Sequence, residues 1–295
     1  MNRGILYAAG AYAWWGLAPI YFKQMAAVPS LEIVLHRSIW SLLFLAIVLG
    51  IKRHWAWFGS ALRQPRLLAL FALSALMMSA NWLIFVWAIN QGRLIDAALG
   101  YFINPLFNVL LGVLVLHERL RRAQWLALSL AAGGVLWLTI QAGHLPWIAL
   151  TLAGTFALYG LIRKTAPLGA LEGLTMETFL LAFIAVPMLA LLNLRGDAVA
   201  TSSGPAMIGW LLLTGPVTAV PLLLFAAGAR RVTLTTLGLL QYIGPTISFM
   251  LGIWLYHEPF DAMKLIGFVL IWSALAVYSA EGWWVGRQRG VVAAV

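Results

Sequence analysis

The stretch Leu99-Gly-Tyr-Phe-Ile-Asn-Pro-Leu-Phe-Asn-Val-Leu-Leu-Gly-Val-Leu-Val-Leu-His-Glu118 recurs 140 residues later as Leu239-Leu-Gln-Tyr-Ile-Gly-Pro-Thr-Ile-Ser-Phe-Met-Leu-Gly-Ile-Trp-Leu-Tyr-His-Glu258. Seven of the twenty positions are identical without a gap. A purely apolar composition would reproduce leucines and isoleucines. It would not also align a proline, a glycine and a His-Glu pair. The chain therefore contains two copies of one structural unit.

Each copy is a long apolar run with a proline near its middle, at Pro105 and Pro245. In water such a proline usually ends a helix, whereas a membrane helix continues with a bend when neighbours satisfy the freed carbonyl. The whole chain is 63% hydrophobic and 9% charged, with a mean hydropathy of +0.92. A soluble domain carries about 25% charged residues. The sequence therefore predicts an integral membrane protein with helices bent at the two prolines.

Ten apolar runs approach or exceed the roughly 20 residues that cross a bilayer. Their connections are short and leave no room for a soluble domain. The N-terminal run lacks a cleavage pattern and is interpreted as the first span. The longest connection, 52–66, is basic and carries two tryptophans, which favours the membrane interface. The expected spans are 4–22, 32–51, 67–90, 94–116, 122–140, 145–162, 171–193, 206–228, 232–256 and 264–285.

The basic residues predict the orientation of these spans. If the N-terminus is cytoplasmic, the inside segments hold 14 lysines and arginines and the outside segments hold 4. This bias follows the positive-inside rule and puts both termini in the cytoplasm. The net charge of +10 is thus a signature of membrane topology, and not of nucleic-acid binding.

The repeat extends beyond the opening stretch, because Leu6–Leu17 matches Leu150–Leu161 at an offset of 144. Each half then holds five spans, and an odd number forces the halves into opposite orientations. The expected fold is an all-α membrane protein of ten transmembrane helices, arranged as two inverted five-helix repeats over 1–143 and 144–295. Transporters built this way bind substrate between the repeats, near the middle of the membrane.

Several motifs carry a resemblance to a known family: Trp15-Gly16 with Pro19, Glu32 with His36-Arg37, Asn81-Trp82, and the run from Leu99 to Pro105. With them, the chain resembles the EamA-type ten-span permeases of the drug/metabolite transporter superfamily, and within these the RarD branch. The resemblance covers essentially the full length. It implies an inner-membrane carrier for small organic solutes and leaves the substrate open.

Polar side chains inside the spans are the candidates for a substrate site. On span four, helical spacing places them on one face, and span nine carries a counterpart face. Such groups line a cavity in one interpretation and join helices to one another in the other. Two aromatic residues related by the repeat would cover the apolar part of a solute. The candidates are Trp15, Asn81, Tyr101, Asn104, Asn108, Tyr159, Gln241 and Ser248.

Two charged residues inside spans stand 140 positions apart, Arg37 and Glu177. A charge within a span is a functional candidate by default, although Arg37 could instead reach the outer interface. Because the repeats are inverted, the two are expected as opposite ends of a pathway and not as direct partners. Arg37 would favour an anionic or zwitterionic solute, and Glu177 is a candidate proton carrier or gate.

The predicted function is a secondary transporter of a small metabolite or drug-like solute, working by alternating access. The alternative is a membrane enzyme or a channel. Neither an H-E-x-x-H nor a G-x-S-x-G motif occurs, and there are no cysteines. We therefore expect no catalytic residues, no metal and no cofactor. The predicted partners are the lipid bilayer, a small solute of anionic, zwitterionic or aromatic character, and a coupling proton.

Overall fold

The computed structural model describes residues 3–25, 27–90, 94–142, 147–199, 204–255 and 262–292, and every regular element in these ranges is helical. A short 3-10 turn (Lys23–Met25) follows the first helix. The helices are α1 (Arg3–Phe22), α2 (Ser30–Ile51), α3 (Ala56–Leu62), α4 (Pro65–Asn90), α5 (Leu94–Leu114), α6 (Arg122–Ala142), α7 (Trp147–Thr165), α8 (Ala170–Arg195), α9 (Pro205–Ala229), α10 (Leu234–Leu240), α11 (Ile243–Trp254) and α12 (Ala262–Val292).

Each expected span coincides with one helix, except the ninth, which is divided between α10 and α11. The short helix α3 lies in the tryptophan-bearing connection 52–66. Within the described residues, five helices are long and apolar enough to cross a membrane, namely α2, α4, α6, α8 and α9. The protein is thus an all-helical, multi-pass membrane protein.

The distribution of polar and apolar side chains is that of a protein dissolved in lipid. Leu194 and Ile140 are exposed over 86% and 64% of their surfaces, while Arg163 and Glu177 are 1% and 3% exposed. A soluble protein almost never buries charges while exposing so many large apolar side chains. In a bilayer the arrangement is favourable, because the exposed side chains meet hydrocarbon and the charges meet each other.

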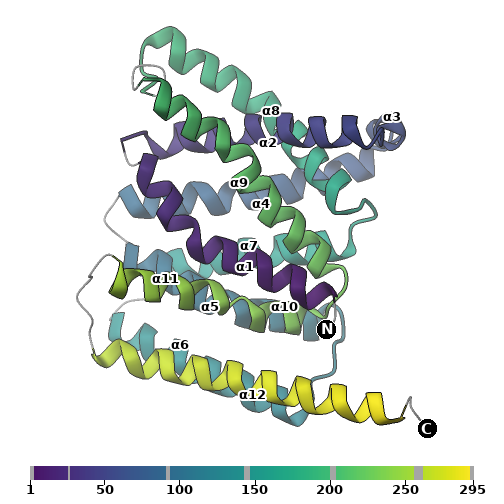
Figure 1. Ribbon diagram of the computed structural model, residues 1–295, viewed down its shortest axis with the longest axis vertical. Coiled ribbons are helices and arrows are strands. Elements are labelled where there is room, and N and C mark those ends of the chain that lie inside the picture. The colour runs from purple at the N-terminus through teal and green to yellow at the C-terminus, as the bar shows by residue number, and fades with distance from the viewer. Residues whose placement is uncertain are drawn as a thin grey trace.

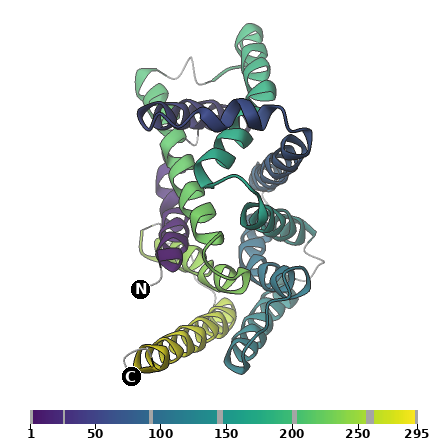
Figure 2. The same ribbon diagram turned by 90° about the vertical axis from the view of Figure 1, so that its right-hand side faces the viewer.

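The helices stack along the long axis of the molecule. Helices α6 and α12 pack against each other at one end, and α2 packs against α8 at the other (Figure 1, Figure 2). Between these ends, α1 packs on α9 and α11, and α4 packs on α7. Helix α5 contacts both α7 and α10. Segments from the two halves of the sequence therefore interleave.

The ninth expected span breaks at Gln241 and Tyr242, which corrects the prediction of one helix bent at Pro245. Pro245 lies in the first turn of α11, where a missing N–H costs little. The Gln241 carbonyl, which a residue with an N–H at 245 could have bonded, instead accepts from the Gly244 N–H at 3.2 Å. Pro105, by contrast, lies inside the continuous helix α5.

Glu118, at the end of the first repeated stretch, binds the start of α10, the helix in which the second stretch begins. Its carboxylate accepts hydrogen bonds from the backbone N–H groups of Leu234 (2.6 Å) and Thr235 (3.0 Å), and from the Thr235 hydroxyl (2.8 Å). A carboxylate at the first turn of a helix satisfies free N–H groups and offsets the positive end of the helix dipole. Glu118 thus positions α10 against α5.

Candidate functional site

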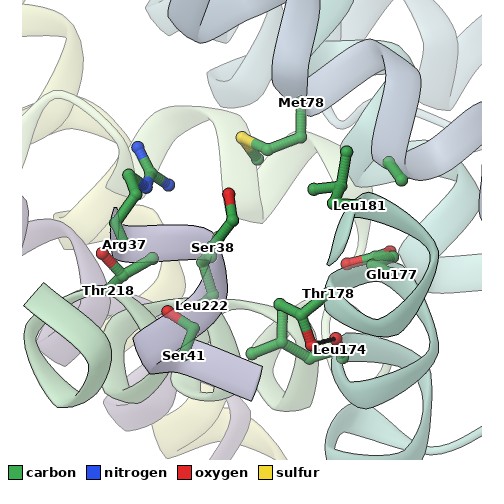
Figure 3. A pocket seen from close by; sticks show the side chains of 11 residues that line it. Arg37, Ser38, Ser41, Met78, Leu174, Glu177, Thr178, Leu181, Thr218 and Leu222 are labelled. Atoms are coloured by element: carbon green, nitrogen blue, oxygen red, sulfur yellow. Dashed lines mark hydrogen bonds between the residues drawn. The ribbon is translucent and has the colours of Figure 1, made fainter. Parts of the chain in front are cut away.

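A pocket with a volume of about 40 Å³ lies where α2, α4, α8 and α9 meet. Charged, hydroxyl-bearing and apolar side chains share its wall, and Figure 3 shows Arg37 and Glu177 on opposite sides with Ser38 between them. A ligand cavity for a drug-sized molecule measures about 300–1,000 Å³. In this conformation the pocket therefore accommodates only a small group. Its lining residues are Arg37, Ser38, Ser41, Ala75, Met78, Leu174, Glu177, Thr178, Leu181, Thr218 and Leu222.

Arg37 is the eighth residue of α2 and is 6% exposed. Its guanidinium carbon lies 3.7 Å from the centre of the Trp82 ring, so one face of the cation is covered by the indole. Within the described part of the chain, the Nη1 atom is buried and has no hydrogen-bond partner. The cation is therefore held by a ring face, while its edge keeps hydrogen-bonding capacity.

Glu177 is the eighth residue of α8, and its carboxylate is surrounded by donors. The Ser74 hydroxyl donates to Oε1 at 2.6 Å, and the Tyr159 hydroxyl donates to Oε2 at 3.4 Å. Nη1 of Arg163 lies 3.5 Å from Oε1, and Nη2 of Arg163 donates to the Ala170 carbonyl at 2.9 Å. The negative charge is thus compensated on the side away from the pocket.

The wall of the pocket repeats itself. Eight of its eleven residues form four pairs at the 140-residue offset of the opening stretch. A charge of opposite sign replaces its partner in one pair, and a hydroxyl replaces a hydroxyl in another. The pairs are Arg37/Glu177, Ser38/Thr178, Ser41/Leu181 and Met78/Thr218.

Arg37 and Glu177 line one pocket from opposite sides, and their expected role as the two ends of a pathway stays a prediction. Seven residues separate each from the start of its helix, which is roughly 10 Å of helical rise. Since α2 and α8 pack against each other, both side chains reach this pocket, from its opposite sides. The structure gives no ion pair between the two within its described residues, and Glu177 is paired with Arg163 instead.

The two aromatic candidates lie beside the pocket and do not line it. Tyr159 is fully buried and stacks on Phe225, with ring centroids 5.8 Å apart. Trp15 is half-buried and contacts Phe156 edge-on, at 5.7 Å. Together with Tyr12 these rings join α1, α7 and α9. Tyr159 still reaches the site, because its hydroxyl bonds Glu177.

Two of the amide candidates bridge helices. Nδ2 of Asn81 donates to the Leu152 carbonyl at 2.8 Å and to Oγ1 of Thr155 at 3.0 Å, which joins α4 to α7. Nδ2 of Asn108 donates to Oε1 of Gln241 at 3.0 Å, which joins α5 to the break between α10 and α11. This is the helix-joining geometry that the sequence left as an alternative.

The other candidates on α5 and α11 differ from these. Asn104 is buried, and its Oδ1 has no hydrogen-bond partner in the described part of the chain. Tyr101 is 37% exposed and meets the Phe85 ring edge-on at 5.6 Å. Ser248 belongs to α11, but its side chain falls outside the described structure. A role for any of them in solute binding stays a prediction.

Sequence reasoning missed several residues around the pocket. Arg163 was counted among the cytoplasmic charges at the end of a span, yet it is fully buried against Glu177. Ser74 and Thr218 lie in apolar runs, and nothing in the sequence around them indicated a functional role. The 140-residue offset relates Ser38, the neighbour of Arg37, to Thr178, and it relates Met78 to Thr218. The repeat is therefore the signal that could have pointed to both threonines.

Comparison with known proteins defines the class. A model of the EamA-like transporter family matches residues 2–140. A crystal structure of a protein, 19% identical, superposes with a TM-score of 0.69 over 94% of this chain and 96% of that one, which bears on the fold alone. An uncharacterized transporter of Pseudomonas aeruginosa is 45% identical over 96% of this chain and 95% of its own.

A relative of Escherichia coli, named protein RarD, is 43% identical over 97% of both chains. The chain therefore belongs to the EamA-like transporter family, among the RarD proteins. The matching family and the Pseudomonas aeruginosa relative carry the name of a transporter, which supports a role in membrane transport.

Proposed function

We propose that this protein is a secondary transporter that carries a small organic solute across the bacterial inner membrane by alternating access. Ten spans would form two inverted repeats, 1–143 and 144–295, with both termini in the cytoplasm. The observation that carries the proposal is the composition of the pocket, in which four residue pairs are related by the 140-residue offset. A site built from equivalent positions of both repeats lies where each repeat can close one side.

A second pair of contacts supports the inverted arrangement. Glu32, in the first turn of α2, accepts a hydrogen bond from the Val199 N–H, beyond the end of α8, at 3.0 Å. Glu172, in the first turn of α8, lies 2.8 Å from Nε2 of His54, beyond the end of α2. Each carboxylate therefore ties the start of its own helix to the far end of the other repeat's helix.

The test is solute exchange across a membrane with a pocket that can be blocked. The chain has no cysteine, so Ser38→Cys introduces a single thiol into the pocket and Ser60→Cys introduces one on the exposed face of α3. Purified variants would be screened against metabolites and drugs for a solute that stabilises them. Exchange of that solute would then be measured in liposomes.

We expect saturable exchange by both variants before treatment with a small thiol reagent, and loss of exchange after treatment only in Ser38→Cys. Flux that does not saturate would favour the channel alternative. Chemical conversion of the solute without net movement would favour the enzyme. Equal inhibition, or none, in the two treated variants would remove the pocket from the pathway.

A further inference from the structure

The pocket presents an uneven set of charges. Arg37 and Glu177 are its only charged lining residues among those described. The Glu177 carboxylate already meets Arg163 at 3.5 Å and accepts from the Ser74 and Tyr159 hydroxyls. Among the described residues no carboxylate pairs with Arg37, and the group that covers its guanidinium is the neutral Trp82 ring. The local charge balance is therefore positive on the Arg37 side.

Because Trp82 covers a face of the Arg37 guanidinium, the edge of the guanidinium remains available for binding. A guanidinium is planar and carries its N–H donors around the edge, in a fork that matches a carboxylate. Trp82 occupies a face at 3.7 Å and does not use these donors. The buried Nη1 atom has no acceptor in the described part of the chain. Leaving a buried charged donor unsatisfied is costly, so an acceptor that enters the pocket is strongly favoured.

Three of the four hydroxyl groups in the wall already donate their hydrogen to a backbone carbonyl and can act as acceptors toward a ligand. Ser38 donates its hydrogen to the Val34 carbonyl at 2.9 Å, and Thr178 donates to the Leu174 carbonyl at 2.9 Å. Ser41 donates to the Gly215 carbonyl at 3.3 Å. A hydroxyl oxygen whose hydrogen is engaged still accepts. The pocket therefore combines a cationic donor edge with several neutral acceptors, which suits a group bearing negative charge next to a hydroxyl.

We propose that this pocket binds the head of a hydroxylated carboxylate, with its carboxylate on the Arg37 edge and its hydroxyl donating to the wall. This inference rests on the proposed transport function and names the class of solute. The volume of about 40 Å³ fits such a head group and excludes a whole drug-sized molecule in this conformation. A zwitterion is disfavoured, because its ammonium group would compete with Arg163 for Glu177.

The proposal is tested by calorimetric measurement of binding to the purified protein. Four small probes are compared, and three of them each differ from lactate in one feature. Lactate carries both groups, propionate lacks the hydroxyl, lactamide lacks the charge, and alanine replaces the hydroxyl with an ammonium group. We expect lactate to bind most tightly, propionate more weakly, and lactamide and alanine at least about tenfold more weakly than lactate.

Arg37→Gln should weaken lactate binding by about tenfold or more, whereas Arg231→Gln should not change it. Arg231 is exposed and lies over the Tyr7 ring, outside the pocket. The size-exclusion elution profile and the thermal unfolding curve of Arg37→Gln would confirm that this variant is folded. The absence of lactate binding, equal binding of lactamide, tighter binding of alanine, or unchanged binding in Arg37→Gln would overturn the proposal.

These outcomes are separable from the transport assay. Exchange of a neutral or cationic solute that Arg37→Gln leaves intact would reject the carboxylate site and keep the transporter. Lactate binding that depends on Arg37, in a protein that exchanges no solute across liposomes, would keep the site and reject the transporter.

Discussion

Single residues in this protein carry polar contacts that the apolar environment makes consequential. The hydrogen bond between Asn108 and Gln241 joins the two copies of the repeated stretch at 3.0 Å. Hydrogen bonds between membrane helices contribute about 0.6 kcal/mol on average and up to about 1.7 kcal/mol. The pair is therefore expected to act on stability.

Asn108→Ala and Gln241→Ala should each lower the free energy of unfolding, and the double variant should lose less than the sum of the two. A double-mutant cycle from unfolding in mixed micelles should give a coupling of roughly 0.5–1.5 kcal/mol. Additive losses, accompanied by lost solute affinity in the single variants, would instead assign these amides to the substrate.

The buried Arg163–Glu177 pair allows the energetic cost of leaving a buried charge unpaired to be measured. Arg163→Met leaves the Glu177 carboxylate without its cation, which is expected to cost about 3–5 kcal/mol. Adding Glu177→Leu should recover much of that loss, because no buried charge then remains. Arg121, which is half-exposed and 2.9 Å from Glu281, serves as the control. Arg121→Met should cost less than about 1 kcal/mol in the same unfolding assay, and an equal loss in both would contradict the argument.

At the scale of elements, the two repeated prolines act differently. Pro105 lies within the continuous helix α5, while Pro245 follows the break between α10 and α11. Gly238 packs α10 so closely on α5 that an added Cβ would lie 2.7 Å from the Pro105 carbonyl oxygen, so the two prolines have different surroundings. The same proline signal in two sequences therefore gives two backbone paths.

Pro245→Ala restores an N–H that can bond the Gln241 carbonyl and should extend helical structure across the break. Hydrogen exchange of the amides from Tyr242 to Thr246 should slow in this variant, while Pro105→Ala should change exchange only near α5. Both variants should insert normally and exchange solute at altered rates. Parent-like exchange of amides and solute in both would make the prolines packing features alone.

At the scale of the whole molecule, the sequence predicted best those features that recur along the chain, namely the helices formed by the long apolar runs. Apolar run length predicted the helices, because a helix buried in lipid must be apolar along its whole length. The pocket was harder to predict, because it depends on where helices cross. Arg37 and Glu177 were recognised as intramembrane charges, but neither their shared pocket nor Arg163 beside Glu177 follows from distance along the chain.

Repeat-related residues in the two halves differ in exposure. Tyr101 is 37% exposed, whereas Gln241, its counterpart at the 140-residue offset, is 4% exposed. Phe85 is half-buried, and its counterpart Phe225 is fully buried. The first half is therefore more exposed than the second at these two pairs of positions. Under the proposed orientation, with the N-terminus in the cytoplasm, the more exposed Tyr101 belongs to the outer half of its span.

Cysteine labelling can test both the orientation and this asymmetry, because the parent chain has no thiol. Gln24→Cys and Ser60→Cys, at exposed positions beyond α1 and on α3, report the two membrane faces. In intact cells an impermeant thiol reagent should label Gln24→Cys and leave Ser60→Cys untouched until lysis. Tyr101→Cys should react from the outside, and Gln241→Cys should react slowly from either side. Labelling of Ser60→Cys from outside would reverse the topology, and equal rates at 101 and 241 would mean that both halves are equally open.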